Sequence, residues 1–219
     1  SEYAPRSCMV LGIMSEEAGD AEKAFEFYQK IVDEHPGSPL VADAIARQAA
    51  ISEKVIAQRS RGVFAILRNE EDRAKKFEQV IANDPYGSDA AARCIRLGDF
   101  YLGIEEYGKA ETMFRKVVEE FPRTPAAETA RYRLLCVRRA AISTASSDVA
   151  GHRALAADID AFLADHPQSA HAAELREMTD SALVSLYWFG DRLEQNEAEM
   201  LEAELLRRGQ GVSEVQPLL

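Results

Sequence analysis

Four prolines end the same short phrase at four places along the chain. Each phrase runs from an aromatic or aliphatic residue through two more apolar residues to the proline. Proline stops an α-helix because it lacks an amide hydrogen and clashes with the preceding turn. A phrase that recurs in this way predicts a stack of helical hairpins, none of which can bury its apolar face without a neighbour. The four prolines are Pro36, Pro85, Pro122 and Pro167.

The residues before each proline form the apolar stripe of an amphipathic helix. In the third phrase, Ala110, Phe114 and Val117 recur at helical spacing, and charged residues fill most of the other positions. A hydroxyl residue follows each proline and is expected to cap the next helix. These hydroxyl residues are Ser38, Ser88, Thr124 and Ser169.

The sequence therefore predicts an all-α fold, a tetratricopeptide-like superhelix (α-solenoid) of about five helical hairpins. We expect one domain over residues 1–208, followed by a disordered tail over 209–219. The hairpins are expected at residues 3–35, 38–84, 88–121, 124–166 and 169–208.

Two segments resemble the tetratricopeptide repeat. Residues 91–124 match it through Leu97, Gly98, Tyr101, Ala110, Phe114 and Pro122, and residues 5–38 match it through Leu11, Gly12, Ala24, Tyr28 and Pro36. Glycine and alanine let the two helices of a hairpin touch, while the aromatic rings fill the space between hairpins. The resemblance implies a non-catalytic scaffold that binds protein partners along a groove lined by the first helix of each hairpin.

The helix junctions also look like those of BamD, a lipoprotein of the machinery that assembles β-barrels in bacterial outer membranes. The segments that carry this likeness are Phe25 to Ala44, Phe114 to Ala130 and Phe162 to Ala173. It implies a place on the periplasmic face of the outer membrane, with β-barrel assembly components or extended peptides as partners and a lipid anchor upstream of Ser1. A repeat family that works with the Tol and Pal proteins shares this phrase. The alternative is therefore an adaptor of that periplasmic kind, or a cytoplasmic one, with an unrelated partner.

Composition narrows the range of partners. The formal net charge of -11 gives no attraction to nucleic acids or to anionic lipid surfaces. No apolar run approaches the ~20 residues that a membrane span needs. Cys8, Cys94 and Cys136 have neither disulfide-like nor metal-like spacing, so buried inert thiols are favoured. We expect no metal, no cofactor and no enzymatic activity.

The groove that the resemblance implies gives six candidate partner-binding residues. Packing between helices is an equally good account of Ile13 and Ile95. The six residues are Arg6, Met9 and Ile13 in the first hairpin, and Ile95, Asp99 and Leu102 in the third.

Three further residues are candidates outside the groove. Arg138 and Arg139 belong to a basic cluster in an acidic chain, which is either a solvated helix face or a docking patch for an acidic partner. Trp188 is either core or an interface anchor, because tryptophan is enriched in binding hot spots.

Overall fold

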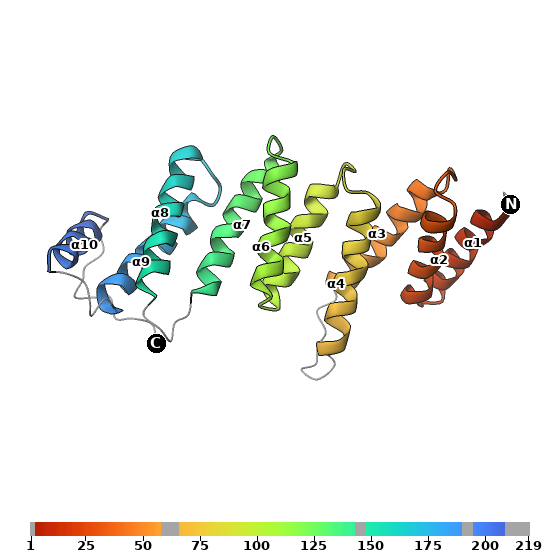
Figure 1. Ribbon diagram of the computed structural model, residues 1–219, viewed down its shortest axis with the longest axis horizontal. Helices are drawn as coiled ribbons and strands as arrows, with labels where there is room; N and C mark the ends of the chain where they lie inside the picture. The colour runs from red at the N-terminus through yellow and green to blue at the C-terminus, as the bar shows by residue number, and fades with distance from the viewer. Residues whose placement is uncertain (1–2, 58–65, 143–147, 190–194, 209–219) are drawn as a thin grey trace. The chain divides into compact units, whose positions relative to one another are not determined.

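Ten α-helices, packed in pairs, make up the described part of the computed structural model (Figure 1). That part covers residues 3–57, 66–142, 148–189 and 195–208, without the side chains of 55–70 and 188–198. The predicted all-α fold of helical hairpins is confirmed, since the helix pairs fall where the five hairpins were expected. The helices are α1 (Tyr3–Glu17), α2 (Ala21–Glu34), α3 (Val41–Ala57), α4 (Ile66–Asn83), α5 (Ala90–Gly103), α6 (Tyr107–Glu120), α7 (Pro125–Ala141), α8 (Val149–Asp165), α9 (Ala172–Phe189) and α10 (Gln195–Arg207).

The chain divides into two compact units, Ser1–Phe100 and Tyr101–Leu219. Each unit is described by itself below. A single domain over residues 1–208 stays a prediction, and the expected disordered tail at 209–219 lies outside the described residues.

One hydrogen-bond pattern recurs at the four proline junctions. At the first, the amide of His35 donates to the carbonyl of Ile31, the amide of Ser38 to His35, and the amide of Val41 to Ser38. The second, third and fourth junctions use the same spacing, with donors Asp84, Gly87 and Ala90, then Phe121, Thr124 and Ala127, then His166, Ser169 and Ala172. Each proline lies two residues beyond a helix end, so it stops the helix without removing any of these bonds.

The expected hydroxyl caps are wrong in detail. Ser38 and Ser169 lie three residues before α3 and α9, and each hydroxyl accepts from the amide two positions later, 3.2 Å and 3.3 Å away. Thr124 directly precedes α7, yet its hydroxyl donates to the carbonyl of Phe121 at 2.8 Å instead of capping. The hydroxyls therefore stabilise the turn between two helices and not the first turn of the second helix.

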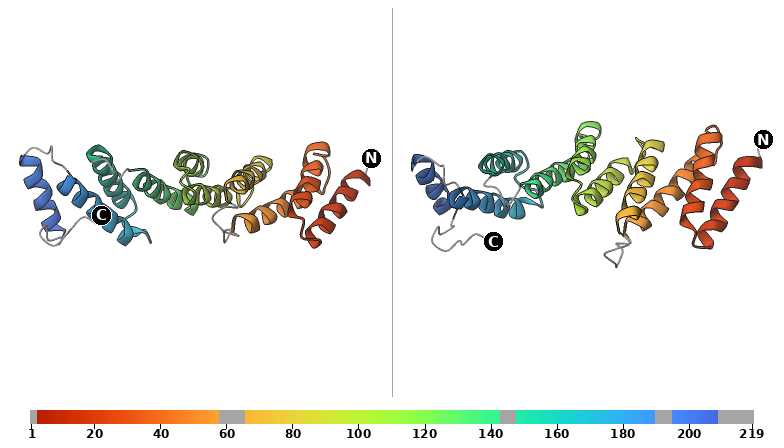
Figure 2. Two further views of the ribbon diagram at one scale, coloured as in Figure 1. Left: turned by 90° about the horizontal axis from the view of Figure 1, so that it is seen from below. Right: turned by 60° about the horizontal axis from the view of Figure 1, so that its bottom comes forward.

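In the first unit, α1, α2 and α3 lie side by side, as both views in Figure 2 show. Gly12 allows the closest approach, because a Cβ atom there would fall 2.4 Å from a ring carbon of Tyr28. One core cluster of this unit consists of Met9, Ala24, Phe25, Tyr28, Ile31, Ala44, Ala49, Ile51 and Val80.

A buried amide network joins α2, α3 and α4. Gln48 is fully buried, and its side-chain nitrogen donates to the side-chain oxygen of Gln29 at 2.8 Å. The Asn83 nitrogen donates to Gln29 at 2.9 Å and to Gln48 at 3.2 Å. Because a buried amide is costly without partners, this network favours one alignment of the three helices.

In the second unit, one core cluster is built from four helices. Tyr132 and Leu135 come from α7, and Leu205 comes from α10. The remaining fully or nearly fully buried members are Leu155, Ala156, Ile159 and Phe162 from α8, and Leu175, Met178, Ala182, Leu183 and Leu186 from α9.

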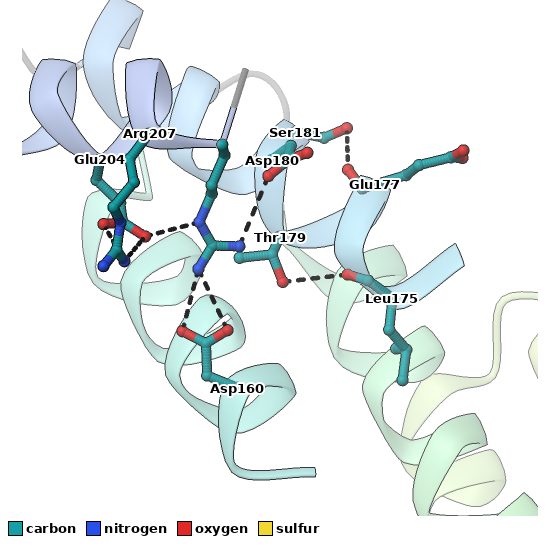
Figure 3. A network of polar contacts seen from close by, with 9 residues as sticks. Asp160, Leu175, Glu177, Thr179, Asp180, Ser181, Glu204 and Arg207 are labelled. Atoms are coloured by element: carbon teal, nitrogen blue, oxygen red, sulfur yellow. Dashed lines mark hydrogen bonds and ion pairs between the residues drawn. The ribbon is translucent and has the colours of Figure 1, made fainter. Parts of the chain in front are cut away.

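Three carboxylates converge where α10 meets this core. Figure 3 shows Asp160 of α8, Asp180 of α9 and Glu204 of α10 pointing toward one another. The guanidinium of Arg208 pairs with them at 3.4, 3.6 and 2.7 Å respectively. Hydrogen bonds from Arg207 and Arg208 lower the pKa of Glu204, so this carboxylate stays charged and holds the end of α10.

The turns inside the first and third hairpins share a left-handed residue. Gly19 has φ +78°, and Glu105, at the equivalent position, has φ 64°. In both turns the amide of the following residue, Asp20 or Glu106, donates to a carbonyl five positions back. This helix-ending turn favours glycine, because a Cβ atom is strained at positive φ.

Glu105→Gly is therefore expected to raise the free energy of unfolding by about 1 kcal/mol, since it removes that strain. Urea unfolding followed by circular dichroism measures the change. Gly19→Ala is the matched control and should lower the stability by a similar amount. A Glu105→Gly variant less stable than the wild type would contradict the assignment of strain to this turn.

Candidate functional site: partner-binding surfaces

The predicted groove residues of the first hairpin differ in how accessible they are. Arg6 is exposed, and Ile13 is half-buried against the core of the first unit. Met9 is only 7% exposed and belongs to that core. Its side chain therefore leaves little surface for a partner, and a role of Met9 in binding stays a prediction.

The predicted residues of the third hairpin lie on α5. Ile95, Asp99 and Leu102 are all half-buried. Their role in binding stays a prediction. Trp188 belongs to α9, but its side chain lies outside the described residues.

A cavity of about 540 Å³ lies beside the junction between α2 and α3 in the first unit. Arg6 and Pro5 of α1 form one wall, and the junction forms the other. Of the predicted groove residues, Arg6 is the one that reaches this cavity. The junction wall consists of Glu34, His35, Pro36, Gly37, Ser38, Pro39 and Leu40.

Polar contacts of Glu16 tie the first three helices together near this end of the chain. Its carboxylate accepts from the Tyr28 hydroxyl at 2.5 Å and from the Arg47 guanidinium at 3.5 Å. Burial, with the hydrogen bond to Glu16, raises the pKa of Tyr28. The first helices of adjacent hairpins, α1 and α3, are thus joined by an ion pair.

The second unit has a cleft of about 280 Å³ between α7 and α8. Its apolar floor contains Leu134, Leu135 and Phe162, and charged side chains line its rim. Arg138 pairs with Asp158 across the cleft, while Arg131 makes no ion pair with another described residue. The full lining is Arg131, Leu134, Leu135, Arg138, Asp158, Ala161, Phe162, Asp165 and His166.

The basic cluster is therefore only partly available to a partner. Arg138 and Arg139 are both exposed in the last turn of α7, where positive charge also suits the helix dipole. Arg138 forms an ion pair with Asp158. The guanidinium of Arg133 lies over the Tyr132 ring. Arg139, and Arg131 two turns earlier on the same helix, make no ion pair with another described residue.

Tyr132 joins α7 to α9 at the other side of the same helix. Its hydroxyl donates to Glu174 at 2.7 Å, and its ring stacks on His171 with centroids 3.7 Å apart. Burial is the main cause that raises the pKa of Tyr132 and of the neighbouring Cys136 thiol. A thiol with a raised pKa is a poor nucleophile at neutral pH, which suits a packing role for Cys136.

Two of the histidines pack against aromatic rings. His171 stacks on Tyr132, and the His166 ring lies 4.9 Å from that of Phe162. Burial lowers the pKa of His152, which favours its neutral form. Across the described ranges, no group of three or more histidine, cysteine, aspartate or glutamate side chains is placed to hold a metal ion. None of the helices described is both long enough and apolar enough to span a membrane.

Comparisons with known proteins give a family model that matches one segment of the chain, and several similar solved structures. The tetratricopeptide repeat model matches residues 11–38, which run from α1 through α2 into the first proline junction. No curated protein matches the chain. The match shows that residues 11–38 are similar to a tetratricopeptide repeat, and the described helices of the chain pack in pairs as such repeats do.

Two of the similar solved structures are described as TPR-like repeats, and another is the MamA protein. The TPR-like repeats of a Podosopora anserina protein described as a putative kinesin light chain share 14% identity over 99% of both chains, with a TM-score of 0.49. A variant form of these repeats shares 14% identity over 93% of this chain and 95% of the other, with a TM-score of 0.48. The MamA protein shares 13% identity over 95% of this chain and 97% of its own, with a TM-score of 0.42.

Sequence reasoning found one wall of the cleft and missed the other. The basic cluster on α7 was visible as charge in an acidic chain. The sequence does not show that Asp158 and Asp165 of α8 form the other wall, because their position in the cleft depends on how α8 is rotated against α7. Phe162 was visible only as part of the repeated apolar phrase.

Arg138→Gln is expected to lower the free energy of unfolding by less than about 1 kcal/mol, because its ion pair with Asp158 is 45% exposed on both sides. Phe162→Ala should cost about 3–5 kcal/mol, because this ring fills the core beneath the cleft. Urea unfolding compares the two. A larger loss for Arg138→Gln than for Phe162→Ala would mean that the ion pair, and not the apolar floor, holds α7 against α8.

Proposed function

We propose that this protein is a non-catalytic scaffold that binds segments of other proteins. Tetratricopeptide repeats generally act in this way, and residues 11–38 match that family. The observation that carries the proposal is the cleft between α7 and α8, which combines an apolar floor with charged side chains on both walls. A pocket of this kind fits the side chains of a peptide or partner loop.

The charges of the cleft define the segment that fits it. Leu134 and Phe162 offer an apolar surface for one large side chain. Arg131 lies beside them, half-buried and without an ion pair to another described residue. A partner segment with an apolar side chain next to a carboxylate satisfies both, because a carboxylate near a guanidinium forms a charge-assisted hydrogen bond.

Photocrosslinking from inside the cleft tests this function. A photoreactive amino acid at Ala161, an exposed position in the cleft lining, should give discrete protein adducts in an extract of the source cells. The same amino acid at Ala157, exposed on the same helix but outside the lining, is the matched control. Arg131→Glu should remove the adducts formed from Ala161.

The proposal fails if Ala161 gives no adduct, if Ala157 gives the same adducts, or if Arg131→Glu leaves them unchanged. Competition with an excess of unlabelled wild-type protein shows whether the adducts arise from saturable binding. The unfolding curve of Arg131→Glu serves to show that the variant is folded.

The finer proposal is a BamD-like component of outer-membrane β-barrel assembly, held on the periplasmic face by a lipid upstream of Ser1. It rests on the likeness of the three junction segments, Phe25 to Ala44, Phe114 to Ala130 and Phe162 to Ala173. Its partners are other assembly components or extended segments of barrel proteins. A coding sequence with a secretory leader and a lipoprotein cysteine just upstream of Ser1 supports this proposal.

The second candidate is a tetratricopeptide adaptor with an unrelated partner, either cytoplasmic or of the periplasmic Tol and Pal type. The three cysteines all lie among the described residues and form no disulfide, which favours the reducing cytoplasm among these alternatives. Translation that starts directly near Ser1 would exclude the BamD-like assignment and leave this candidate.

A further inference from the structure

The outer face of α1 carries an uncovered apolar stripe. Seven large apolar side chains are exposed in the part of the chain that the structure describes, and four of them belong to this one helix. They are Tyr3, Val10, Leu11 and Met14, which are 77%, 55%, 44% and 58% exposed. Apolar residues gathered in this way mark an interaction surface more often than scattered ones do.

Two charges of opposite sign flank the Val10–Met14 part of the stripe. Tyr3, Val10 and Met14 are separated by seven and four residues, so they share one face of the helix. Arg6 and Glu17 are exposed on the same face. Neither makes an ion pair with another described residue.

The equivalent face of the third hairpin, on α5, contacts the hairpin before it. In the register that aligns Gly19 with Glu105, Leu11 corresponds to Leu97, which is fully buried. Val10 corresponds to Arg96, which pairs with Glu53 of α3 at 2.5 Å. Ser7 corresponds to Arg93, which pairs with Asp84 at 3.3 Å. This face of a first helix is therefore the one that packs on the preceding hairpin.

The two faces differ in their charges. The α5 face presents two arginines and meets two carboxylates of the second hairpin, so the two surfaces in that contact are different. The α1 face presents one arginine and one glutamate on either side of an apolar centre, and is complementary to itself.

We propose that this face of α1 binds the same face of a second copy of the chain. The two α1 helices lie antiparallel across a twofold axis. Arg6 of one copy then meets Glu17 of the other at both ends, and Val10 and Met14 of the two copies pack at the centre. A single helix pair buries a small area, so the dimer forms in a weak, concentration-dependent way. The inference does not depend on the proposed function.

Sedimentation equilibrium of residues 1–219 tests the proposal. The wild type should show a monomer–dimer equilibrium at concentrations up to about 1 mM. Met14→Lys should weaken it by about tenfold or more, because it places a charge in the apolar centre. Met200→Lys is the matched control on α10, where Met200 is 74% exposed, and should leave the equilibrium unchanged.

Exchanging the two charges tests the antiparallel arrangement. Arg6→Glu and Glu17→Arg should each weaken the dimer, and the double variant should restore it, since the pairs form again with reversed signs. The substituted residues Arg6, Met14, Glu17 and Met200 are all exposed, so circular dichroism should show that each variant is folded. A wild type that stays monomeric at the highest concentration would overturn the proposal. So would a dimer that tolerates Met14→Lys, or a double variant no better than the single ones.

Discussion

The hydrogen-bond pattern of the proline junctions is the constraint on which the fold depends. Three backbone bonds with the same spacing connect the end of each second helix to the start of the next first helix, at residues 31–41, 80–90, 117–127 and 162–172. Because backbone bonds fix the path of the chain, each junction connects its two helices over the same spacing of residues. The proline ends the helix at the point where this pattern begins.

Side chains then build a different core around each junction. In the first unit, the absent side chain of Gly12 admits the Tyr28 ring, and the amides of Gln29, Gln48 and Asn83 fix the alignment of three helices. In the second unit, Tyr132 performs the linking role with a hydroxyl bond to Glu174 and a ring stacked on His171. The common backbone therefore leaves room for surfaces that differ between repeats, such as the cleft between α7 and α8 and the stripe of α1.

The hairpins could be predicted from sequence because their signals are local. Pro36, Pro85, Pro122 and Pro167 each end a helix that an apolar stripe precedes, and both the proline and the stripe are properties of a few neighbouring residues. Whether a side chain is buried by the neighbouring hairpin could not be predicted from sequence. Leu11 and Leu97 match the same motif, yet one is exposed and the other is fully buried, because only Leu97 has a preceding hairpin packed against it within the described residues. The burial of Met9 could not be predicted for a related reason, since it depends on the rotation of α1 about its axis.

Native-state hydrogen exchange at the junction amides tests the central claim most directly. The account predicts strong protection for the amides of Ser38, Gly87, Thr124 and Ser169, which donate to carbonyls three residues earlier. NMR resolves each of these amides individually. Exchange at the rate of an unstructured loop at any of the four would contradict the shared junction. Protection of all four amides would support the conclusion that the same backbone hydrogen-bond pattern joins the hairpins.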